Sequence, residues 1–171
     1  SLDTPAPWND MSSTIINVTI GDFINDNILS IGDYAFYLCD SLDSITIPDS
    51  VTNIGSCAFE YCTSLTYNIY YNAKYLGNTN NPYLALVDTT SDSITSCEIH
   101  QDTRVIGDGA FYDCEDLANV TIGESVTTIG EGAFFDCRSL TSVTIPDSVT
   151  SMGASAFRFC TSLTSVTIGD S

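Results

Sequence analysis

The side chains in this sequence that could do chemistry are seven cysteines and a single histidine, His100. Thiolates serve as metal ligands, disulfide partners and nucleophiles, and imidazole serves as a general base or metal ligand. Five of the cysteines share one phase of a repeating pattern, three residues after a phenylalanine: Cys39, Cys62, Cys114, Cys137 and Cys160. One thiol per repeat, in an odd total, predicts a ladder of buried, reduced cysteines that act as weak donors.

Metal and catalytic sites need more than this spacing provides. Cys57 and Cys62 approach a zinc spacing, with four residues between them, but zinc sites combine two such pairs or their histidine equivalents. Cys97 and His100 share a predicted strand, on which residues three apart point to opposite faces. The acidic residues near turns do not follow the alternating order of an EF-hand loop. We therefore expect no enzyme, no metal site and no cofactor, with Cys97 in the core and His100 at the surface.

The charge of the chain excludes further classes. It has 22 Asp and Glu against four Lys and Arg, which gives a net charge of −18. Such a charge repels phosphate backbones and the basic residues are scattered singly, so nucleic-acid binding is not expected. No stretch of 18 apolar residues is present, which argues against membrane insertion. The polar start of the sequence predicts that a signal peptide and an anchor are not in this chain.

An internal repeat supplies the elements that hold these residues. The motif Ile-Gly-x-x-Ala-Phe, termed the box, occupies residues 31–36, 54–59, 106–111 and 129–134, and a fifth copy at 152–157 begins with Met. The box phenylalanines recur every 23 residues within each group. A short Val-Thr-Ile or Ile-Thr-Ile segment closes most repeats, and its alternation of apolar and polar residues is typical of a half-buried strand.

A unit of 23 residues is too short to enclose a core of its own. Burial must therefore come from the stacking of successive coils, each packed on its neighbours. The strands are then expected to form a parallel β-sheet on one face, with short helical or 3-10 turns between the other segments. We predict a single repeat solenoid over residues 1–171, mostly β, in which contacts join adjacent coils.

The longer pattern Cys-x-x-Leu-x-Ser-x-Thr-Ile-Pro-x-Ser-Val-Thr-x-Ile-Gly-x-x-Ala-Phe is nearly complete at residues 39–59 and 137–157. It resembles the BspA-like, Treponema pallidum-type leucine-rich repeats, over roughly residues 28–65 and 105–171. The resemblance implies a leucine-rich-repeat solenoid on a surface or secreted protein of anaerobic bacteria or mucosal protozoa. It also implies relatives that adhere to host matrix proteins and to other cells. It names no ligand, because function lies on the exposed residues of such a scaffold.

The repeat is interrupted between Phe59 and Phe111, which are two periods plus six residues apart. Residues 67–92 lack the box, and two β-forming stretches there flank Gly-Asn-Thr-Asn-Asn-Pro, a dense turn signal. This pattern predicts a β-hairpin that protrudes from its coil or caps it. Five of the nine tyrosines fall in this segment. They either cover apolar surface left by the missing phenylalanine or form a binding surface.

The two ends of the chain are expected to differ from the regular coils. Residues 1–27 are predicted to form an N-terminal cap, with Trp8 over the open end of the stack, and a first coil lengthened by four residues. The chain stops straight after a predicted strand. We therefore expect it to be a fragment of a longer array.

Apolar strand residues are predicted to point inward, so the residues between them form a polar outer face. The predicted partner-binding residues are Asn17, Thr19, Ser44, Thr46, Glu98, Asn119, Thr121, Ser142, Thr144, Ser165 and Thr167 on the strands, and Tyr70, Tyr71, Tyr75 and Tyr83 in the irregular segment. The expected function is extracellular or cell-surface adhesion to a host matrix protein or glycan, by a monomer. A structural spacer in a larger surface protein is the first alternative. An enzyme is the second, for which the chain offers no nucleophile and base pair.

Overall fold

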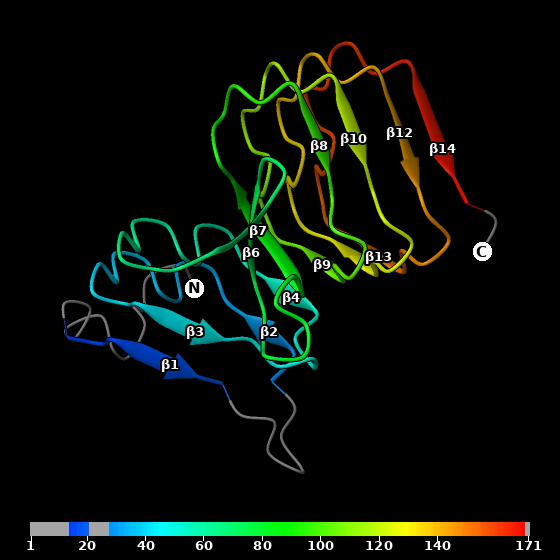
Figure 1. The fold of residues 1–171 in the computed structure, drawn as a ribbon. Helices are drawn as coiled ribbons and strands as arrows, with labels where there is room; N and C mark the ends of the chain where they lie inside the picture. Colours follow the sequence, from blue (N-terminus) through cyan, green and yellow to red (C-terminus); the bar gives the residue numbers. More distant parts are fainter. Residues whose placement is uncertain (1–13, 21–27, 170–171) are drawn as a thin grey trace.

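The computed structural model describes residues 14–20 and 28–169, which form a solenoid of short strands (Figure 1). The described residues contain strands and turns and no helix. Accordingly, none of them belongs to a helix long and apolar enough to cross a membrane. The predicted parallel solenoid is confirmed, whereas the prediction of short helical or 3-10 turns is wrong.

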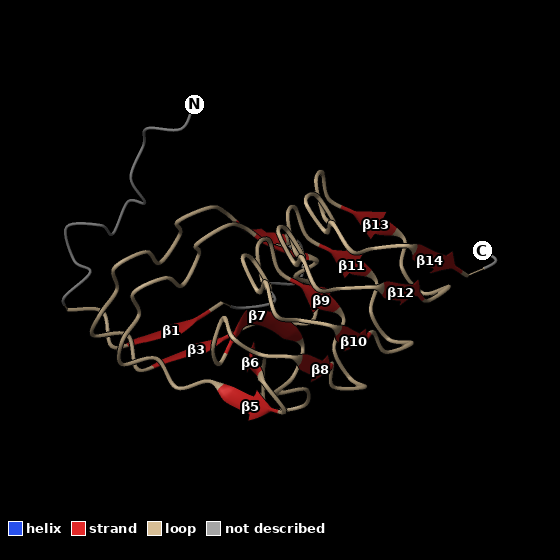
Figure 2. Cartoon of the chain, turned by 90° about the horizontal axis from the view of Figure 1, so that it is seen from above, coloured by secondary structure: helices blue, strands red, loops and turns tan. Residues whose placement is uncertain are grey.

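Each regular coil contributes two strands that run parallel to their counterparts in neighbouring coils (Figure 2). The outer row consists of β1 (Asn17–Thr19), β3 (Ser44–Thr46), β8 (Ser96–Glu98), β10 (Asn119–Thr121), β12 (Ser142–Ile145) and β14 (Ser165–Ile168). The inner row consists of β2 (Ser30–Ile31), β4 (Asn53–Ile54), β9 (Val105–Ile106), β11 (Thr128–Ile129) and β13 (Ser151–Met152). The alternating sequence explains the outer row, because Val143 and Ile145 are buried while Ser142 and Thr144 are exposed.

The box is a tight turn that uses left-handed backbone in place of a helix. In every regular coil the fourth and eighth residues, counted from the start of the box, have a positive φ. The fourth residues are Tyr34, Cys57, Gly109, Gly132 and Ser155, and the eighth are Leu38, Tyr61, Asp113, Asp136 and Phe159. A right-handed helix cannot continue through such residues, so the sequence-based prediction of helical turns fails here. Only two of the ten positions hold glycine, so the sequence offered little indication of the left-handed conformation.

This turn directs three amides of each box toward the next coil. In the last pair of coils the hydrogen bonds run from Gly132, Phe134 and Asp136 to the carbonyls of Ala154, Ala156 and Arg158, at 3.0, 2.8 and 2.8 Å. The same three bonds join the first coil to the second and the third to the fourth. The box phenylalanines stack as well, with ring centroids of Phe111 and Phe134 4.8 Å apart and those of Phe134 and Phe157 5.0 Å apart. Stacking between successive coils therefore provides the burial that a single coil cannot provide alone.

The cysteine ladder also follows this register. The thiols of Cys62, Cys137 and Cys160 donate to the carbonyl of the phenylalanine 26 residues earlier, at 3.0, 3.2 and 3.1 Å. All seven cysteines are free thiols within the described residues, and five of them are buried, Cys97 included. The prediction of buried, weakly donating thiols is therefore confirmed for Cys62 and Cys137, while Cys160 is half-buried at the end of the stack.

The irregular segment forms three antiparallel strands that lie between the two groups of regular coils (Figure 1). β5 (Asn68–Tyr70) pairs with β6 (Ala73–Leu76), and β6 pairs with β7 (Ala85–Thr89). β7 then pairs in parallel with β9, so it takes the place of an inner-row strand. The predicted hairpin around residues 77–82 is present, but its first strand is split by a turn at Tyr71, whose φ is 48°.

Residues on both faces of the β6–β7 pair are buried, so the hairpin does not protrude. Tyr75 and Leu86 belong to the apolar core of the C-terminal half, while their neighbours Leu76 and Ala85 belong to the core of the N-terminal half. All four side chains are 2% exposed or less. Strand alternation thus lets one hairpin cover the facing ends of two stacks at once. We refer to residues 67–92 as the wall and to the regular coils before and after it as the two halves.

The predictions for the chain ends fall mostly outside the described residues. Residues 1–13, which include Trp8, and residues 21–27, which hold the expected four-residue lengthening, are not described. The N-terminal cap over residues 1–27 therefore stays a prediction. Of that range only residues 14–20 are described, and they include β1, which pairs with β3 in register.

Candidate functional site

The predicted polar face exists in the C-terminal half, where β8, β10, β12 and β14 lie side by side (Figure 1). Seven predicted residues are exposed there, in two rows along the strands: Glu98, Thr121, Thr144 and Thr167 in one, and Asn119, Ser142 and Ser165 in the other. Among the described residues, the hydroxyls of Thr121, Thr144 and Thr167 have no hydrogen-bond partner within the chain. They are therefore available to a partner molecule.

The N-terminal half carries a smaller version of this face. Asn17, Thr19 and Ser44 are exposed and Thr46 is half-buried. The Ser44 hydroxyl donates to the Asn17 side-chain oxygen across β1 and β3, at 2.6 Å, so this pair is partly satisfied within the chain. The wall separates the two faces, so the predicted sheet surface is interrupted (Figure 2).

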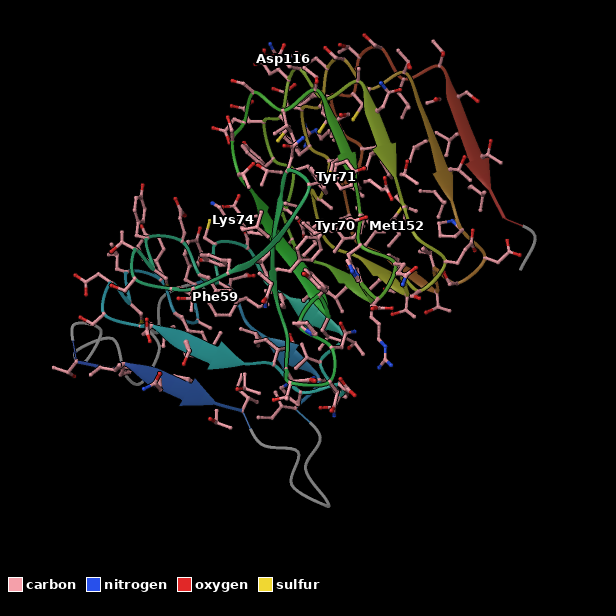
Figure 3. All side chains as sticks on the ribbon, in the orientation of Figure 1. Phe59, Tyr70, Tyr71, Lys74, Asp116 and Met152 are labelled. Carbon is pink, nitrogen blue, oxygen red and sulfur yellow. The ribbon has the colours of Figure 1, made fainter. Side chains whose placement is uncertain are left out.

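The four candidate tyrosines divide between surface and core. Tyr71 is 60% exposed and packs edge-on against the half-buried Tyr70 (Figure 3), and Tyr70 in turn contacts the half-buried Tyr83. Tyr75 is fully buried, so its predicted place on a binding surface is wrong. Burial raises the pKa of the Tyr75 phenol well above its usual range. Its hydroxyl accepts the His100 backbone N–H at 3.2 Å, which gives the ring a structural role.

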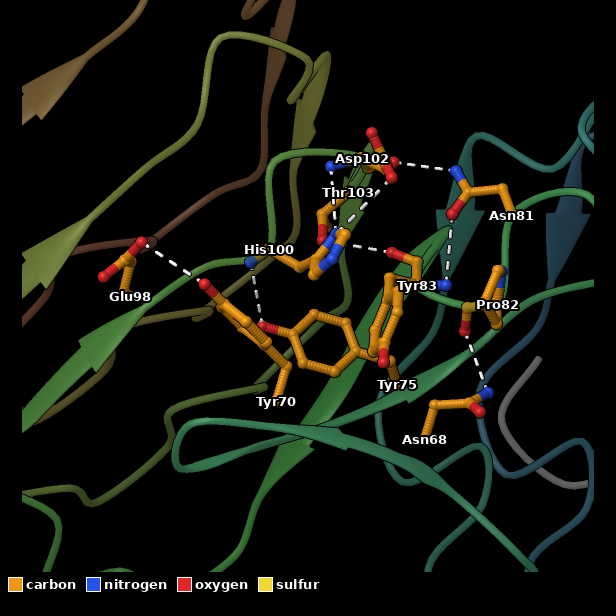
Figure 4. Close-up of polar contacts among 10 residues, drawn as sticks. All are labelled: Asn68, Tyr70, Tyr75, Asn81, Pro82, Tyr83, Glu98, His100, Asp102 and Thr103. Atoms are coloured by element: carbon orange, nitrogen blue, oxygen red, sulfur yellow. Dashed lines mark hydrogen bonds and ion pairs between the residues drawn. The ribbon is translucent and has the colours of Figure 1, made fainter.

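His100 lies inside an aromatic cluster instead of on the open surface (Figure 4). Its ring stacks on Tyr83 with 3.9 Å between centroids, and Tyr70 packs edge-on at 4.8 Å. The His100 side chain is only 17% exposed, so the predicted surface position is wrong. Its Nδ1 accepts the Asp102 backbone N–H at 3.2 Å, which fixes the ring within a loop. Cys97 is buried in the core, and the two side chains form no dyad.

The cluster links the tyrosines to the polar face. The Tyr70 hydroxyl donates to the Glu98 carboxylate at 3.4 Å, and the Asn72 amide donates to the Ser96 carbonyl at 2.8 Å. The turn at Tyr71 therefore lies at the edge of β8. Ser96 is exposed and pairs with Asn119, and it completes the second row of the face although sequence analysis missed it. Its position directly before Cys97, in phase with Ser44, was the available signal.

Among the described residues, one group of carboxylates is close enough to hold a cation. Ligand oxygens of Asp113, Glu115 and Asp136 lie within 4.8 Å of one another. Arg138 already occupies this group, with ion pairs of 2.7 Å to Asp136 and 3.1 Å to Glu115. Its hydrogen bond to Asp136 lowers the pKa of that carboxyl group. The guanidinium supplies the positive charge that a metal ion would otherwise bring.

A cleft of about 540 Å³ opens where the wall lacks a box. It lies between residues 54–60 of the second coil and residues 107–109 of the third, with Tyr67, Val87 and Asp88 from the wall also lining it. Sequence analysis did not predict this cleft. The long sequence interval between Phe59 and Phe111 was the signal for it, because a repeat without a box leaves a gap between the neighbouring boxes.

The fold and the repeated box define a leucine-rich-repeat solenoid of the bacterial type. The model of the family described as the BspA type leucine rich repeat region matches residues 12–80 and 89–171, with six copies. The chain therefore belongs to this family. Among curated proteins there is no significant match.

Solved structures of bacterial leucine-rich-repeat proteins are similar to this chain. One from Bacteroides ovatus is 29% identical over 88% of this chain, which spans 37% of that protein, with a TM-score of 0.48. The Treponema pallidum leucine-rich-repeat protein is 28% identical over 89% of this chain and 58% of its own length, with a TM-score of 0.37. One from Eubacterium ventriosum is 20% identical over 95% of this chain and 62% of its own length, with a TM-score of 0.50. The chain thus spans less than two thirds of each of these proteins.

Proposed function

We propose that this chain is a non-catalytic binding module of a surface or secreted protein, which recognises a host matrix protein through the polar face of its C-terminal half. The observation that carries the proposal is the continuity of that face with the exposed tyrosine turn. Threonine hydroxyls without a partner among the described residues lie on β10, β12 and β14 in the row that includes Glu98, and Tyr70 and Tyr71 border β8. Tyrosine beside small hydroxyl side chains is a composition typical of protein recognition surfaces.

The arrangement of side chains supports recognition over catalysis. His100 uses its Nδ1 within its own loop, and burial raises the pKa of the Cys62, Cys97 and Cys114 thiols. A buried thiol with a raised pKa is a poor nucleophile, because the thiolate is the reactive form. The family is also built from repeats that present surface, so the function of a member is carried by its exposed residues.

The proposal is tested by a binding screen of the purified chain against immobilised host matrix proteins, with mucosal glycans as a second panel. A variant with Thr121→Arg, Thr144→Arg and Thr167→Arg places three bulky cations on the face. The matched control places the same charges on exposed turn residues, as Gln101→Arg, Ser125→Arg and Thr161→Arg. Circular dichroism and a urea titration establish that both variants remain folded.

Saturable binding to a matrix protein that the face variant loses by at least about tenfold, and the control retains, is the expected result. Binding to a glycan alone, lost in the face variant, would contradict a protein partner and indicate that the face binds a carbohydrate. Binding that both variants retain would contradict the face as the site. No binding in either panel would favour the spacer alternative, in which the solenoid separates other domains.

A further inference from the structure

The cleft lies between the boxes at residues 54–59 and 106–111, where a regular solenoid would have one more box. Phe36 and Phe59 stack at 5.4 Å, and Phe111 and Phe134 stack at 4.8 Å, but Phe59 and Phe111 form no ring pair. The two boxes approach each other at their start, where the Asp108 N–H donates to the Ile54 carbonyl at 2.8 Å. Beyond that point the two boxes are separated by the cleft of about 540 Å³.

The second coil presents unpaired donors to this cleft. Where one regular coil follows another, the amides of the fourth, sixth and eighth residues, counted from the start of the box, donate to the next coil. Gly132, Phe134 and Asp136 are an example. The equivalent amides here belong to Cys57, Phe59 and Tyr61, and within residues 14–20 and 28–169 none of the three has a hydrogen-bond acceptor. Phe59 is nevertheless only 7% exposed. A buried N–H without an acceptor raises the free energy of the folded chain. The N–H of Phe59 and its neighbours therefore favour an acceptor from another molecule.

The third coil presents the complementary acceptors. The carbonyls that accept these hydrogen bonds from the preceding coil belong to the third, fifth and seventh residues, counted from the start of the box. Ala133 and Ala156 are examples from the regular coils. In the third coil these are Asp108, Ala110 and Tyr112, of which Asp108 and Tyr112 line the cleft. None of their carbonyls accepts a hydrogen bond from another described residue. The cleft therefore has a row of donors on one side and a row of acceptors on the other.

Its charge is negative. Glu60, Asp88 and Asp108 line the cleft, and no Lys or Arg is among its lining residues. Lys74, which lies over the ring of Tyr67, is already paired with Asp88 at 2.6 Å. Desolvation raises the pKa of the Asp108 carboxyl group, so this side chain gains from a nearby positive charge. Apolar surface comes from Phe59, Val87 and the aromatic rings of the rim. These features together fit a basic and aromatic peptide.

We propose that the cleft binds an extended basic and aromatic segment of a partner protein, whose backbone adds the missing rung between Phe59 and Phe111. Its carbonyls accept the amides of Cys57, Phe59 and Tyr61, while its own amides donate toward the third coil. This is strand addition at an internal gap, with main-chain bonds for affinity and side chains for selectivity. The site is separate from the polar face, so its test is independent of the proposed function.

The chain itself supplies a suitable probe. Residues 153–159, Gly-Ala-Ser-Ala-Phe-Arg-Phe, cover most of the last box and the two residues after it. The carbonyls of Ala154, Ala156 and Arg158 in this segment already accept the amides of Gly132, Phe134 and Asp136. A synthetic copy of this peptide, acetylated and amidated, is titrated into the ¹⁵N-labelled full chain. We expect saturable shifts of the amide signals of Cys57 and Phe59. A peptide N-methylated at the residues matching Ser155, Phe157 and Phe159 is expected to bind at least about 30-fold more weakly, because three donors are removed.

Charge provides the second arm of the experiment. Glu60→Arg reverses one carboxylate on the cleft, and Glu124→Arg makes the same change on an exposed turn. We expect Glu60→Arg to weaken the peptide about fivefold and Glu124→Arg to leave it unchanged. Shifts confined to the amides of Ser155, Phe157 and Phe159 would mean docking on the C-terminal edge and would overturn the proposal. The absence of any saturable shift would overturn it as well.

Discussion

The regular coils around Phe134 and the wall around Tyr75 achieve burial in different ways. Phe134 is fully buried because identical rings stack above and below it, at 4.8 and 5.0 Å. Tyr75 is equally buried because a single hairpin presents one face to each half. Where one regular coil follows another, repetition pairs the three box amides with the next coil, whereas the wall fills the core and leaves the amides of Cys57, Phe59 and Tyr61 unpaired among the described residues. The comparison shows that apolar burial and backbone pairing are separable in a solenoid.

The thiol ladder differs between the regions in the same way. The Cys137 thiol donates to the carbonyl of Phe111, the box residue of the previous coil. Cys114 follows the wall, which has no box, and its thiol instead lies 3.7 Å from the Thr89 hydroxyl. A single hydroxyl from β7 thus replaces the carbonyl that the missing box would have supplied. The wall thus replaces this interior contact of a coil, but it does not supply the turn that a box forms.

The largest expected effect is the loss of a stacked phenylalanine. Phe134→Ala removes a ring packed on both sides and should lower the free energy of unfolding by about 3–5 kcal/mol. Phe157→Ala is the control, since among the described rings Phe157 stacks on Phe134 alone, and a smaller loss is expected. Urea denaturation followed by circular dichroism measures both. Equal losses in the two variants would contradict the role of two-sided stacking.

Alkaline pH probes the buried thiols of both regions. Burial raises the pKa of Cys62 to about 12 and that of Cys114 to about 11, from 9.0 in the exposed state. Above about pH 9 the unfolded chain loses these protons while the folded chain keeps them, so stability must fall as pH rises toward the folded-state values. Each thiol contributes at most about 1.4 kcal/mol per pH unit in that window.

The measurement is a pair of urea titrations at about pH 8 and about pH 10.5, on the wild type and on Cys62→Ala and Cys114→Ala. Each variant is expected to lose about 2 kcal/mol less than the wild type between these two conditions. A wild-type stability that does not change over this interval would show that the thiols are accessible to solvent in the folded protein.

A smaller effect is expected for the Tyr75 hydroxyl. Tyr75→Phe keeps the ring but leaves the His100 backbone N–H without its acceptor, which should cost about 1–3 kcal/mol. Tyr71→Phe, at the exposed turn of the same wall, should change stability by less than about 0.5 kcal/mol. Thermal denaturation of the two variants side by side measures the difference. A neutral Tyr75→Phe would mean that the hydroxyl does not hold the loop at His100.

The smallest expected effect concerns the left-handed residue of each box. Cys57 has a φ of 53°, and glycine adopts this conformation without the steric cost of a Cβ, so Cys57→Gly should stabilise the chain by up to about 1 kcal/mol. Gly132 has a φ of 57°, and Gly132→Ala should destabilise it by about 1 kcal/mol. Urea midpoints decide the signs. Destabilisation by Cys57→Gly would show that its side chain packs usefully at the cleft.

Much of the fold could be predicted from residue spacing. The interval between phenylalanines predicted the coil, and the alternation in Val143 and Ile145 predicted the strand and its exposed face. The turn conformation could not be predicted, because residues such as Tyr34 and Asp136 give no local sign of a positive φ. That conformation is imposed by hydrogen bonds to the next coil, which are tertiary interactions.

The candidate site was predictable only in part. The exposed positions of Thr121, Thr144 and Thr167 follow from strand alternation. The burial of Tyr75 does not, because it depends on both faces of a hairpin being covered, and sequence shows neither neighbour. The stacking of His100 on Tyr83 joins residues 17 apart through the wall, so no local pattern announced it.

Native-state hydrogen exchange at two equivalent amides tests most directly whether the wall fills the core but leaves the box amides of the second coil unpaired. The Phe134 amide donates to Ala156 at 2.8 Å, and the Phe59 amide has no acceptor among the described residues. We predict that Phe134 exchanges only through large-scale unfolding, whereas Phe59 exchanges at least about 100-fold faster although its side chain is buried. Equal protection of the two amides would contradict the account, because it would mean that the ladder is closed at the wall.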